Sequence, residues 1–236
     1  MIKQMVATAG LVLSLTASQG LAAIIVDLNG PEQSYTVQEI IDAGGIQVGD
    51  KLFDNWRVTG IDTNDPDGAL HAGAIKVTGV LINGEYGIRV DGGWTATSGN
   101  TAGTTLGYRV SVTDPAMNIV GATLKITSGG ALGDGSAGVT ANLYDSDPNN
   151  SNPTPFSTST VGAFVGSDPA WTIATGSFDN KSELWVVAGV VVNSPANGQG
   201  TLTEYYHTFA QAVIPEPASI ALIFAGGMLM FGRRRH

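Results

Sequence analysis

The sequence predicts an all-β protein, a jelly-roll-like antiparallel β-sandwich with one short N-terminal helix. Three observations predict it. The 236 residues include 32 glycines and only 13% charged residues, which disfavours long surface helices and favours turns between short strands. Apolar and polar residues alternate, as where Tyr108, Val110 and Val112 are interleaved with Arg109 and Ser111. Roughly ten or more such stretches follow one another at intervals of roughly 8 to 15 residues.

Residues 1–23 have the layout of a secretory signal peptide. Lys3 supplies a positive charge, an apolar stretch begins near Met5, and small residues follow, ending with Ala22 and Ala23. The apolar stretch is too short to span a bilayer comfortably, which makes an uncleaved anchor the less favoured alternative. We expect signal peptidase to cut after Ala22 or Ala23.

The segment TVQEIIDAGG is the best candidate for a helix in the soluble part of the chain. Thr36 and Glu39 form a capping-box pattern, and Gly44 and Gly45 supply a stop. We expect one short helix here, ahead of most strands.

The candidate strands lie between clusters of turn residues. In chain order they are IQVG, WRVTGI, AIKVTGVLI, YGIRVD, LGYRVSVT, ATLKITS, VTANLYD, VGAFVG, WTIATG, LWVVAGVVV and TLTEYYHTFAQAV. LWVVAGVVV is apolar on both faces, which predicts a central strand. The longest loop, residues 146–157, is rich in Asn, Pro and Ser and is typical of a surface excursion. Residues 24–212 are therefore predicted to form one β-sandwich domain.

Composition and charge exclude several classes of function. The formal net charge of −9 repels phosphate backbones, so nucleic acid is not an expected partner. The absence of cysteine rules out disulfides, thiolate zinc sites and a cysteine nucleophile. Without Lys3, Glu216 and the three terminal arginines, 7 of the 11 basic and 19 of the 20 acidic residues remain, a net charge of about −12.

One segment offers a weak calcium alternative. In IDTNDPDGA the oxygen-bearing residues are Asp62, Asn64, Asp65 and Asp67. Closely spaced carboxylates can wrap calcium, but Pro66 breaks the EF-hand register, so an Asp-Pro-Asp-Gly turn is favoured. A second acidic patch with Asp145 and Asp147 supports calcium less strongly. No other cofactor or metal is expected.

Other motifs do not define a catalytic site. Residues 133–138 (GDGSAG) match G-x-G-x-x-G but precede a candidate strand, which favours a hairpin loop over a dinucleotide site. No G-x-S-x-G elbow occurs. His71 and His207 are far apart in sequence and are expected to be solvated or satisfied side chains. No catalytic residue is predicted, and no carboxylate pair stands out for a glycosidase.

Several aromatic side chains could stack on sugars, which leaves a carbohydrate-binding module as an alternative. They are Trp56, Trp94, Trp171, Trp185, Tyr205 and Tyr206. Most tryptophans of a sandwich lie in its core. We expect Trp94, which follows Gly92 and Gly93, to be nearest the surface.

The C-terminal region, residues 213–236, has the features of a membrane tail. Residues 218–232 are apolar apart from Ser219 and are followed by Arg233, Arg234 and Arg235. As a single transmembrane helix this run would rise about 22 Å, against a hydrocarbon core of about 30 Å. The arginines should stay cytoplasmic, which places the main body outside.

Pro215, Glu216 and Pro217, the apolar run and the terminal arginines together resemble the PEP-CTERM sorting signal of Gram-negative bacteria. The resemblance implies an exosortase, a membrane-embedded cysteine transpeptidase-like enzyme, that cuts near the motif. It also implies transfer to the outer surface, often where exopolysaccharide is made. The two prolines lack N–H donors and break a helix, which leaves an extended segment for a protease to bind.

Short segments of the middle also resemble a group of exported PEP-CTERM proteins. They are GDKLFDNW, IRVDGGW, YRVSV with GATLKI, and HTFAQAVIPEPAS. No activity accompanies this resemblance.

These observations predict an exported, non-enzymatic surface or extracellular-matrix protein. Its expected partners are the secretion machinery, signal peptidase, the inner membrane before processing, exosortase and, as a candidate, exopolysaccharide. The alternatives are a carbohydrate-binding module and, less favoured, a secreted carbohydrate-active enzyme.

Overall fold

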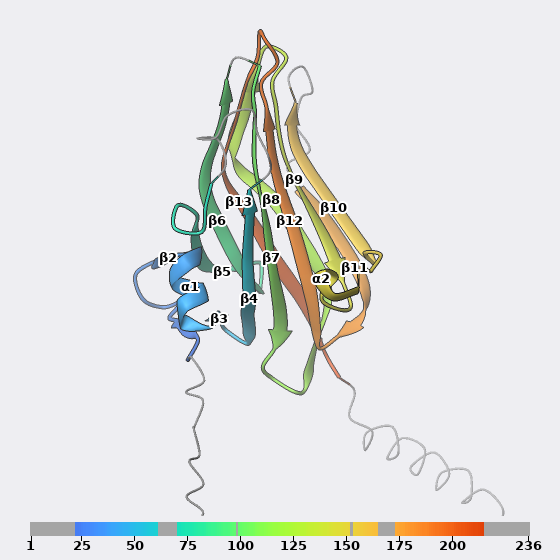
Figure 1. Ribbon diagram of the computed structural model, residues 1–236. Coiled ribbons are helices and arrows are strands. Elements are labelled where there is room, and N and C mark those ends of the chain that lie inside the picture. Colours follow the sequence, from blue (N-terminus) through green and yellow to red (C-terminus); the bar gives the residue numbers. More distant parts are fainter. Residues whose placement is uncertain (1–21, 61–69, 98, 152, 165–172, 215–236) are drawn as a thin grey trace, which may run out of the picture.

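The structure, a computed structural model, describes residues 22–60, 70–97, 99–151, 153–164 and 173–214. They form a two-sheet β-sandwich, as predicted (Figure 1). Sheet A has the strand order β1-β3-β4-β7-β12-β9-β10, and sheet B has the order β11-β8-β13-β6-β5-β2.

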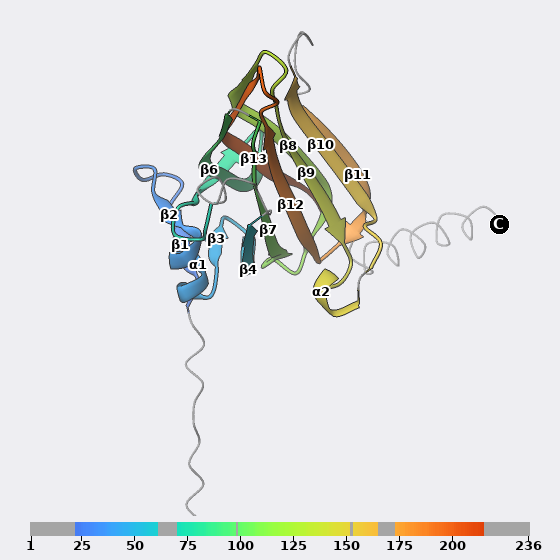
Figure 2. The ribbon, with the colours of Figure 1, turned by 45° about the horizontal axis from the view of Figure 1, so that its top comes forward.

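The N-terminal elements are short and lie on one side of the sandwich (Figure 2). They are β1 (Ile24–Val26), β2 (Ser34–Thr36), α1 (Val37–Ala43) and β3 (Ile46–Val48). The predicted capping box is confirmed: Glu39 N donates to Thr36 Oγ1 at 3.2 Å, and Thr36 N donates to Glu39 Oε2 at 2.7 Å. Gly44 ends the helix with φ +83°. β1 pairs with β3 in parallel, so the prediction of a purely antiparallel sandwich is wrong at this edge.

The longer strands build the two sheets. They are β4 (Lys51–Gly60), β5 (Lys76–Ile82), β6 (Glu85–Thr97), β7 (Thr101–Val112), β8 (Met117–Leu132), β9 (Ser136–Tyr144), β10 (Ser157–Phe164), β11 (Ile173–Lys181), β12 (Glu183–Asn193) and β13 (Gln199–Val213). A second helix, α2 (Pro148–Ser151), lies in the loop predicted at residues 146–157. The central position predicted for LWVVAGVVV is confirmed, because β12 pairs with both β7 and β9.

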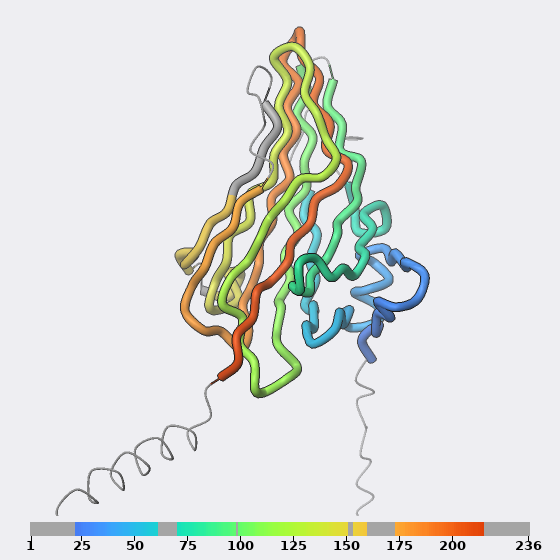
Figure 3. The backbone as a smooth tube through the Cα atoms, turned by 180° about the vertical axis from the view of Figure 1, so that it is seen from behind, coloured from blue at the N-terminus to red at the C-terminus, as the bar shows by residue number. Residues whose placement is uncertain are grey.

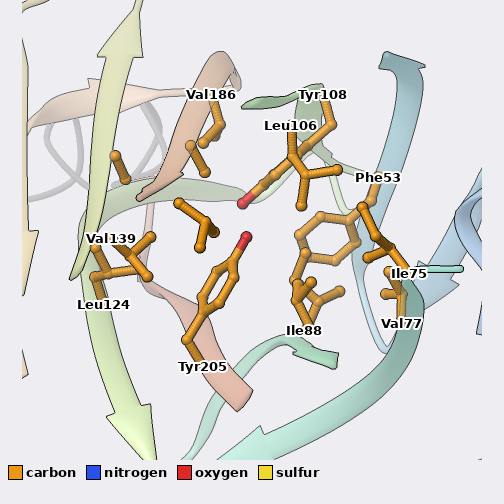
Figure 4. Close-up of a cluster of buried hydrophobic side chains, with 14 of the residues drawn as sticks. Phe53, Ile75, Val77, Ile88, Leu106, Tyr108, Leu124, Val139, Val186 and Tyr205 are labelled. Carbon is orange, nitrogen blue, oxygen red and sulfur yellow. The ribbon is translucent and has the colours of Figure 1, made fainter. Parts of the chain in front are cut away.

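The core fills the space between the sheets with residues from both (Figure 4). Its aromatic part contains Phe53 and Tyr108 from sheet A and Phe209 from sheet B, with ring centroids 5.8–6.1 Å apart. Trp56 stacks on Tyr108 at 4.7 Å and donates its indole N–H to the Phe53 carbonyl. Side chains alternate between the two faces of a strand. The residues between these inward-facing rings therefore lie on the two outer faces of the sandwich.

The described chain begins and ends at the same end of the sandwich (Figure 1). Ile214 follows β13, and its N–H donates to the Ala116 carbonyl at 2.7 Å. The residues predicted to sort and anchor the chain, 215–217 and 233–235, lie outside the described residues, as does most of the predicted signal peptide. Within the described ranges, neither helix is long and apolar enough to span a membrane.

Candidate functional site

The two histidines considered for catalysis lie in different surroundings. His207 is buried in the core, where the Tyr108 hydroxyl lies 2.7 Å from its Nδ1. Desolvation lowers the pKa of His207 to about 3, so its imidazole is neutral near pH 7. His71 is exposed in the turn before β5. His207 therefore acts as a hydrogen-bonded core side chain.

The acidic segments considered for calcium give no cation site in the described structure. Asp145 pairs with Lys181 at 2.6 Å, and Asp147 accepts a bidentate pair from Arg57 at 2.8 and 2.7 Å. The segment at residues 62–67 lies outside the described residues. Within the ranges given above, no three carboxylate or imidazole side chains gather as metal ligands. GDGSAG begins in the turn that joins β8 to β9, with Gly133 at φ +57°. The hairpin prediction is wrong, because β8 lies in sheet B and β9 in sheet A, so the turn connects the two sheets.

Trp94 does not lie at the surface, so the expectation for this residue is wrong. Its side chain is 1% exposed, and its indole N–H donates to Thr104 Oγ1 at 3.1 Å. Gly92 and Gly93 sit inside β6 as a bulge, with Gly93 at φ +67°. The indole folds back over Gly92, where a Cβ would come within 2.3 Å of it. The two glycines thus turn Trp94 into the core.

Trp185 lies on the outer face of sheet A, but guanidinium groups cover its ring. The Cζ atoms of Arg57 and Arg109 lie 5.5 and 5.9 Å from the ring centroid. Bidentate hydrogen bonds to Asp147 and Asp54, respectively, hold these arginines in place. This Trp185 clamp ties β4, β7 and β12 to the start of α2, and it leaves the indole face little room for a ligand.

Tyr206 is the remaining aromatic candidate with an outward, half-exposed side chain. Trp56 and Tyr205 are buried, and Trp171 lies outside the described residues. Tyr206 sits on β13 in the middle of sheet B, whose outer face carries no helix among the described elements (Figure 3). The strand register places it in one row that crosses the whole sheet. The Tyr206 row is Ser34, Thr78, Arg89, Tyr206, Lys125 and Ile173.

Two hollows adjoin Tyr206 on this face. The first, of about 530 Å³, lies between the β1–β2 connection and the exposed end of β5, with Arg89 in its wall. The second, of about 270 Å³, lies over β8 and β11. Tyr206 and Ile82 line both hollows, which together form what we call the sheet B groove. The larger hollow falls within the range of about 300–1,000 Å³ that is typical of small-ligand sites.

A glycine near Tyr206 allows β6 and β13 to pack closely against each other. Gly87 pairs with Thr208 of β13 and Val80 of β5, whose side chains belong to the outer face. A Cβ at this position would lie 2.3 Å from the His207 carbonyl oxygen and 2.6 Å from the Thr208 Cα. No side chain fits there without moving backbone, because Gly87 is buried under the Thr208 side chain.

Arg89 is the centre of a charge network in the wall of the groove. Its Nε lies 3.2 Å from Asp91 Oδ2 and 3.4 Å from Glu204 Oε2. Its Nη2 donates to Glu32 and lies 3.4 Å from Thr78 Oγ1. Since Glu32 belongs to the β1–β2 connection, this pair fixes one wall of the first hollow to the sheet.

Burial and neighbouring charges shift the pKa values of this network. Desolvation alone would lower the pKa of Arg89, but its hydrogen bond to Glu32 and the charge of Asp91 raise it above its usual value. Desolvation raises the pKa of Asp91, Arg89 opposes that rise, and the neighbouring Glu204 carboxylate adds to it.

Comparison with known proteins gives no family assignment. No family model matches the chain, and no curated protein matches it. One similar structure is the module TmCBM61 in complex with β-1,4-galactotriose, at 16% identity and TM-score 0.29 over 66% of this chain and 89% of that one. Another is the CBM22-1 xylan-binding domain of Paenibacillus barcinonensis Xyn10C, at 16% identity and TM-score 0.21 over 81% and 100%.

A third is the family 11 carbohydrate-binding module of Clostridium thermocellum with a β-1,3-1,4-mixed-linked tetrasaccharide. Its identity is 9% and its TM-score 0.23, over 64% of this chain and 88% of that one. TM-scores this far below 0.5 do not establish a shared fold, so neither the fold nor the function of this chain is inferred from them.

Proposed function

We propose that this chain is the precursor of an exported, non-enzymatic surface or extracellular-matrix protein that an exosortase processes at its C-terminal signal. One juxtaposition carries the proposal. Strand β13 ends at Val213, and Ile214, the last residue that the structure describes, is hydrogen-bonded to Ala116 and directly precedes Pro215, Glu216 and Pro217. A sorting enzyme that cut at this motif would leave the β-sandwich whole.

The sequence supports the remaining parts of this route. The N-terminal residues 1–23 would direct export and be removed. The apolar run and Arg233–Arg235 would hold the precursor in the inner membrane until the cut. The released domain would be anionic and would reside at the cell surface or in the matrix. A jelly-roll-like connection of the strands is part of the same proposal.

Polysaccharide binding is the second candidate function. The observation that favours it is the sheet B groove, in which a half-exposed tyrosine lies among hydroxyl and carboxylate groups. A tyrosine offers an apolar ring face to the C–H side of a sugar, while the polar groups around it can bond sugar hydroxyls. The domain would then attach to exopolysaccharide outside the cell.

Replacing Pro215, Glu216 and Pro217 by alanines tests the sorting route. We expect the variant to remain at full length in the inner membrane, whereas the wild-type protein is released with a mass that lacks both ends. Cell fractionation and intact-mass measurement report both events. Truncation after Ile214 is the matched control, and it should be released without any membrane stage. Unchanged release and mass of the alanine variant would refute the sorting proposal.

A further inference from the structure

We propose that the sheet B groove binds an uncharged polysaccharide, laid across the strands and stacked on Tyr206. This inference rests on the proposed function and names the ligand class that the domain would meet outside the cell. Three features of the outer face of sheet B support it: the direction of the groove, the identity of its polar groups and the sign of its charge.

The groove runs across the strands. Its first hollow borders β5 and its second hollow borders β11, with β6, β13 and β8 between them. Strands are spaced about 4.8 Å apart, so the two borders lie roughly 19 Å apart. That length suits several linked sugar rings. Tyr206 lies near the middle, where both hollows meet, and offers the stacking surface.

The polar groups beyond Tyr206 suit sugar hydroxyls. The second hollow is lined by three threonines, an asparagine and one charge of each sign. They are Thr123, Thr175, Thr208, Asn83, Lys125 and Glu85. The Thr208 hydroxyl donates to Glu85 Oε2 at 2.7 Å, which orients its oxygen as an acceptor. Hydroxyl, amide and carboxylate groups together can donate to and accept from vicinal hydroxyls.

The charge of the groove disfavours a polyanion. Its lining carries three carboxyl groups and two cationic groups. The acids are Asp27, Glu32 and Glu85, and the cations are Arg89 and Lys125. Arg89 already faces three carboxylates, so its charge is compensated before any ligand arrives. A uronic-acid polymer would therefore meet net repulsion, whereas a neutral polymer would not.

Affinity measurements on the full chain test the proposal independently of sorting. The full chain is purified in a detergent without a sugar headgroup. It is titrated with soluble neutral polymers (an α-glucan, a β-glucan, a galactan and a mannan) and with polygalacturonate as the anionic probe. We expect at least one neutral polymer to bind, and polygalacturonate to bind at least about tenfold more weakly at low salt, a difference of about 1.4 kcal/mol.

Matched variants locate the site. Y206A should weaken binding of the neutral polymer by about tenfold or more, whereas Y206F, which keeps the ring, should stay within about threefold. Y144A is the control, because Tyr144 is also half-exposed but lies on the outer face of sheet A beside Trp185. Far-UV circular dichroism checks that each variant is folded.

Three results would overturn the proposal. They are tighter binding of polygalacturonate than of any neutral polymer, unchanged binding by Y206A, and no binding of any neutral polymer by the folded chain. None of these would affect the sorting proposal, which fractionation tests separately. Conversely, a failure of sorting would leave the measured affinities standing.

Discussion

The two outer faces of the sandwich differ in what their side chains do. On sheet A the charged residues form ion pairs with one another, and in the Trp185 clamp two of these paired arginines cover the indole. Above the clamp, the outer face of β12 carries small or uncharged residues, among them Gly189 and Val191. On sheet B, a tyrosine and several hydroxyl and charged groups border two hollows. The same alternation of residues thus produces one self-contained face and one face with room for a ligand.

The difference shows that an exposed aromatic residue is not sufficient to indicate a binding surface. Trp185 and Tyr206 are both half-exposed and both lie on central strands. Their neighbours decide their availability, because Arg57 and Arg109 reach over Trp185, whereas two hollows adjoin Tyr206.

The largest expected effect comes from adding a side chain at Gly87, between β6 and β13 of sheet B. Gly87→Val should lower the free energy of unfolding by at least about 3 kcal/mol, because even its Cβ would collide with the His207 carbonyl. The matched change on sheet A is Gly189→Val, where the nearest atom to a Cβ is 4.0 Å away, and it should change stability by about 0.5 kcal/mol or less. Urea unfolding of both variants measures the contrast. Equal losses would show that the two surfaces are equally tight.

The second effect concerns the imidazole directly beneath sheet B. The pKa of His207 is lowered by burial to about 3, below the usual value near 6.5, so the unfolded chain takes up a proton first as the pH falls. Its contribution to stability is full above pH 6.5 and is lost as the pH falls towards 3. The loss between pH 6 and pH 4 should be about 2 to 3 kcal/mol, at about 1.36 kcal/mol per pH unit.

Comparing variants isolates this contribution from that of the carboxylates. His207→Phe should flatten the pH dependence of the urea midpoint between pH 6 and pH 4, although it also removes the partner of the Tyr108 hydroxyl. His71→Asn, on an exposed turn, should leave the slope unchanged. A wild-type slope in His207→Phe would mean that the buried imidazole is not the group that titrates.

The smallest effect compares one carboxylate from each face. Asp54 accepts a bidentate pair from Arg109 at 2.9 and 2.6 Å, so Asp54→Asn should lower the free energy of unfolding by about 1.5 kcal/mol at pH 7. Asp91→Asn should cost about 0.5 kcal/mol or less, because burial and Glu204 already disfavour its charge.

The pH dependence of Asp91→Asn gives a further check on the sign. Since the pKa of Asp91 is raised in the folded state, its favourable contribution is present below the unfolded value near 3.8 and is lost as the pH rises through the folded value. The free energy of unfolding of the variant, relative to that of the wild type, should therefore be highest at pH 7 and lowest at pH 3. Urea titrations of Asp91→Asn and the wild type at both pH values measure this pattern.

The sequence predicted the sandwich because its signals are local. Alternation along β7 and the capping box at Thr36 each depend on residues a few positions apart. The parallel pairing of β1 with β3 depends on how the chain returns after α1, which no local pattern encodes.

The candidate site was harder to predict because the alternation of inward-facing and outward-facing side chains is interrupted inside β13. Leu202 and Tyr205 both point into the core, so the inward positions change from even to odd numbers between them. Between Leu202 and Glu204, β13 has one residue more than the paired strand β8, and this bulge causes the change. Without that bulge, Tyr206 would be assigned to the core and Tyr205 to the surface. Tyr206 was among the aromatic candidates, but nothing in the sequence separated it from its neighbour.

The shared location of the two chain ends has a consequence for orientation. The long strands extend from that end along the length of the sandwich (Figure 1). A domain held by its C-terminus would therefore have its strands roughly perpendicular to the cell surface, with the outer faces of both sheets to the side. A polymer lying across the strands of sheet B would then run parallel to the cell surface. Neighbouring copies could therefore bind one polymer chain in succession. They would form a layer whose height equals that of one domain.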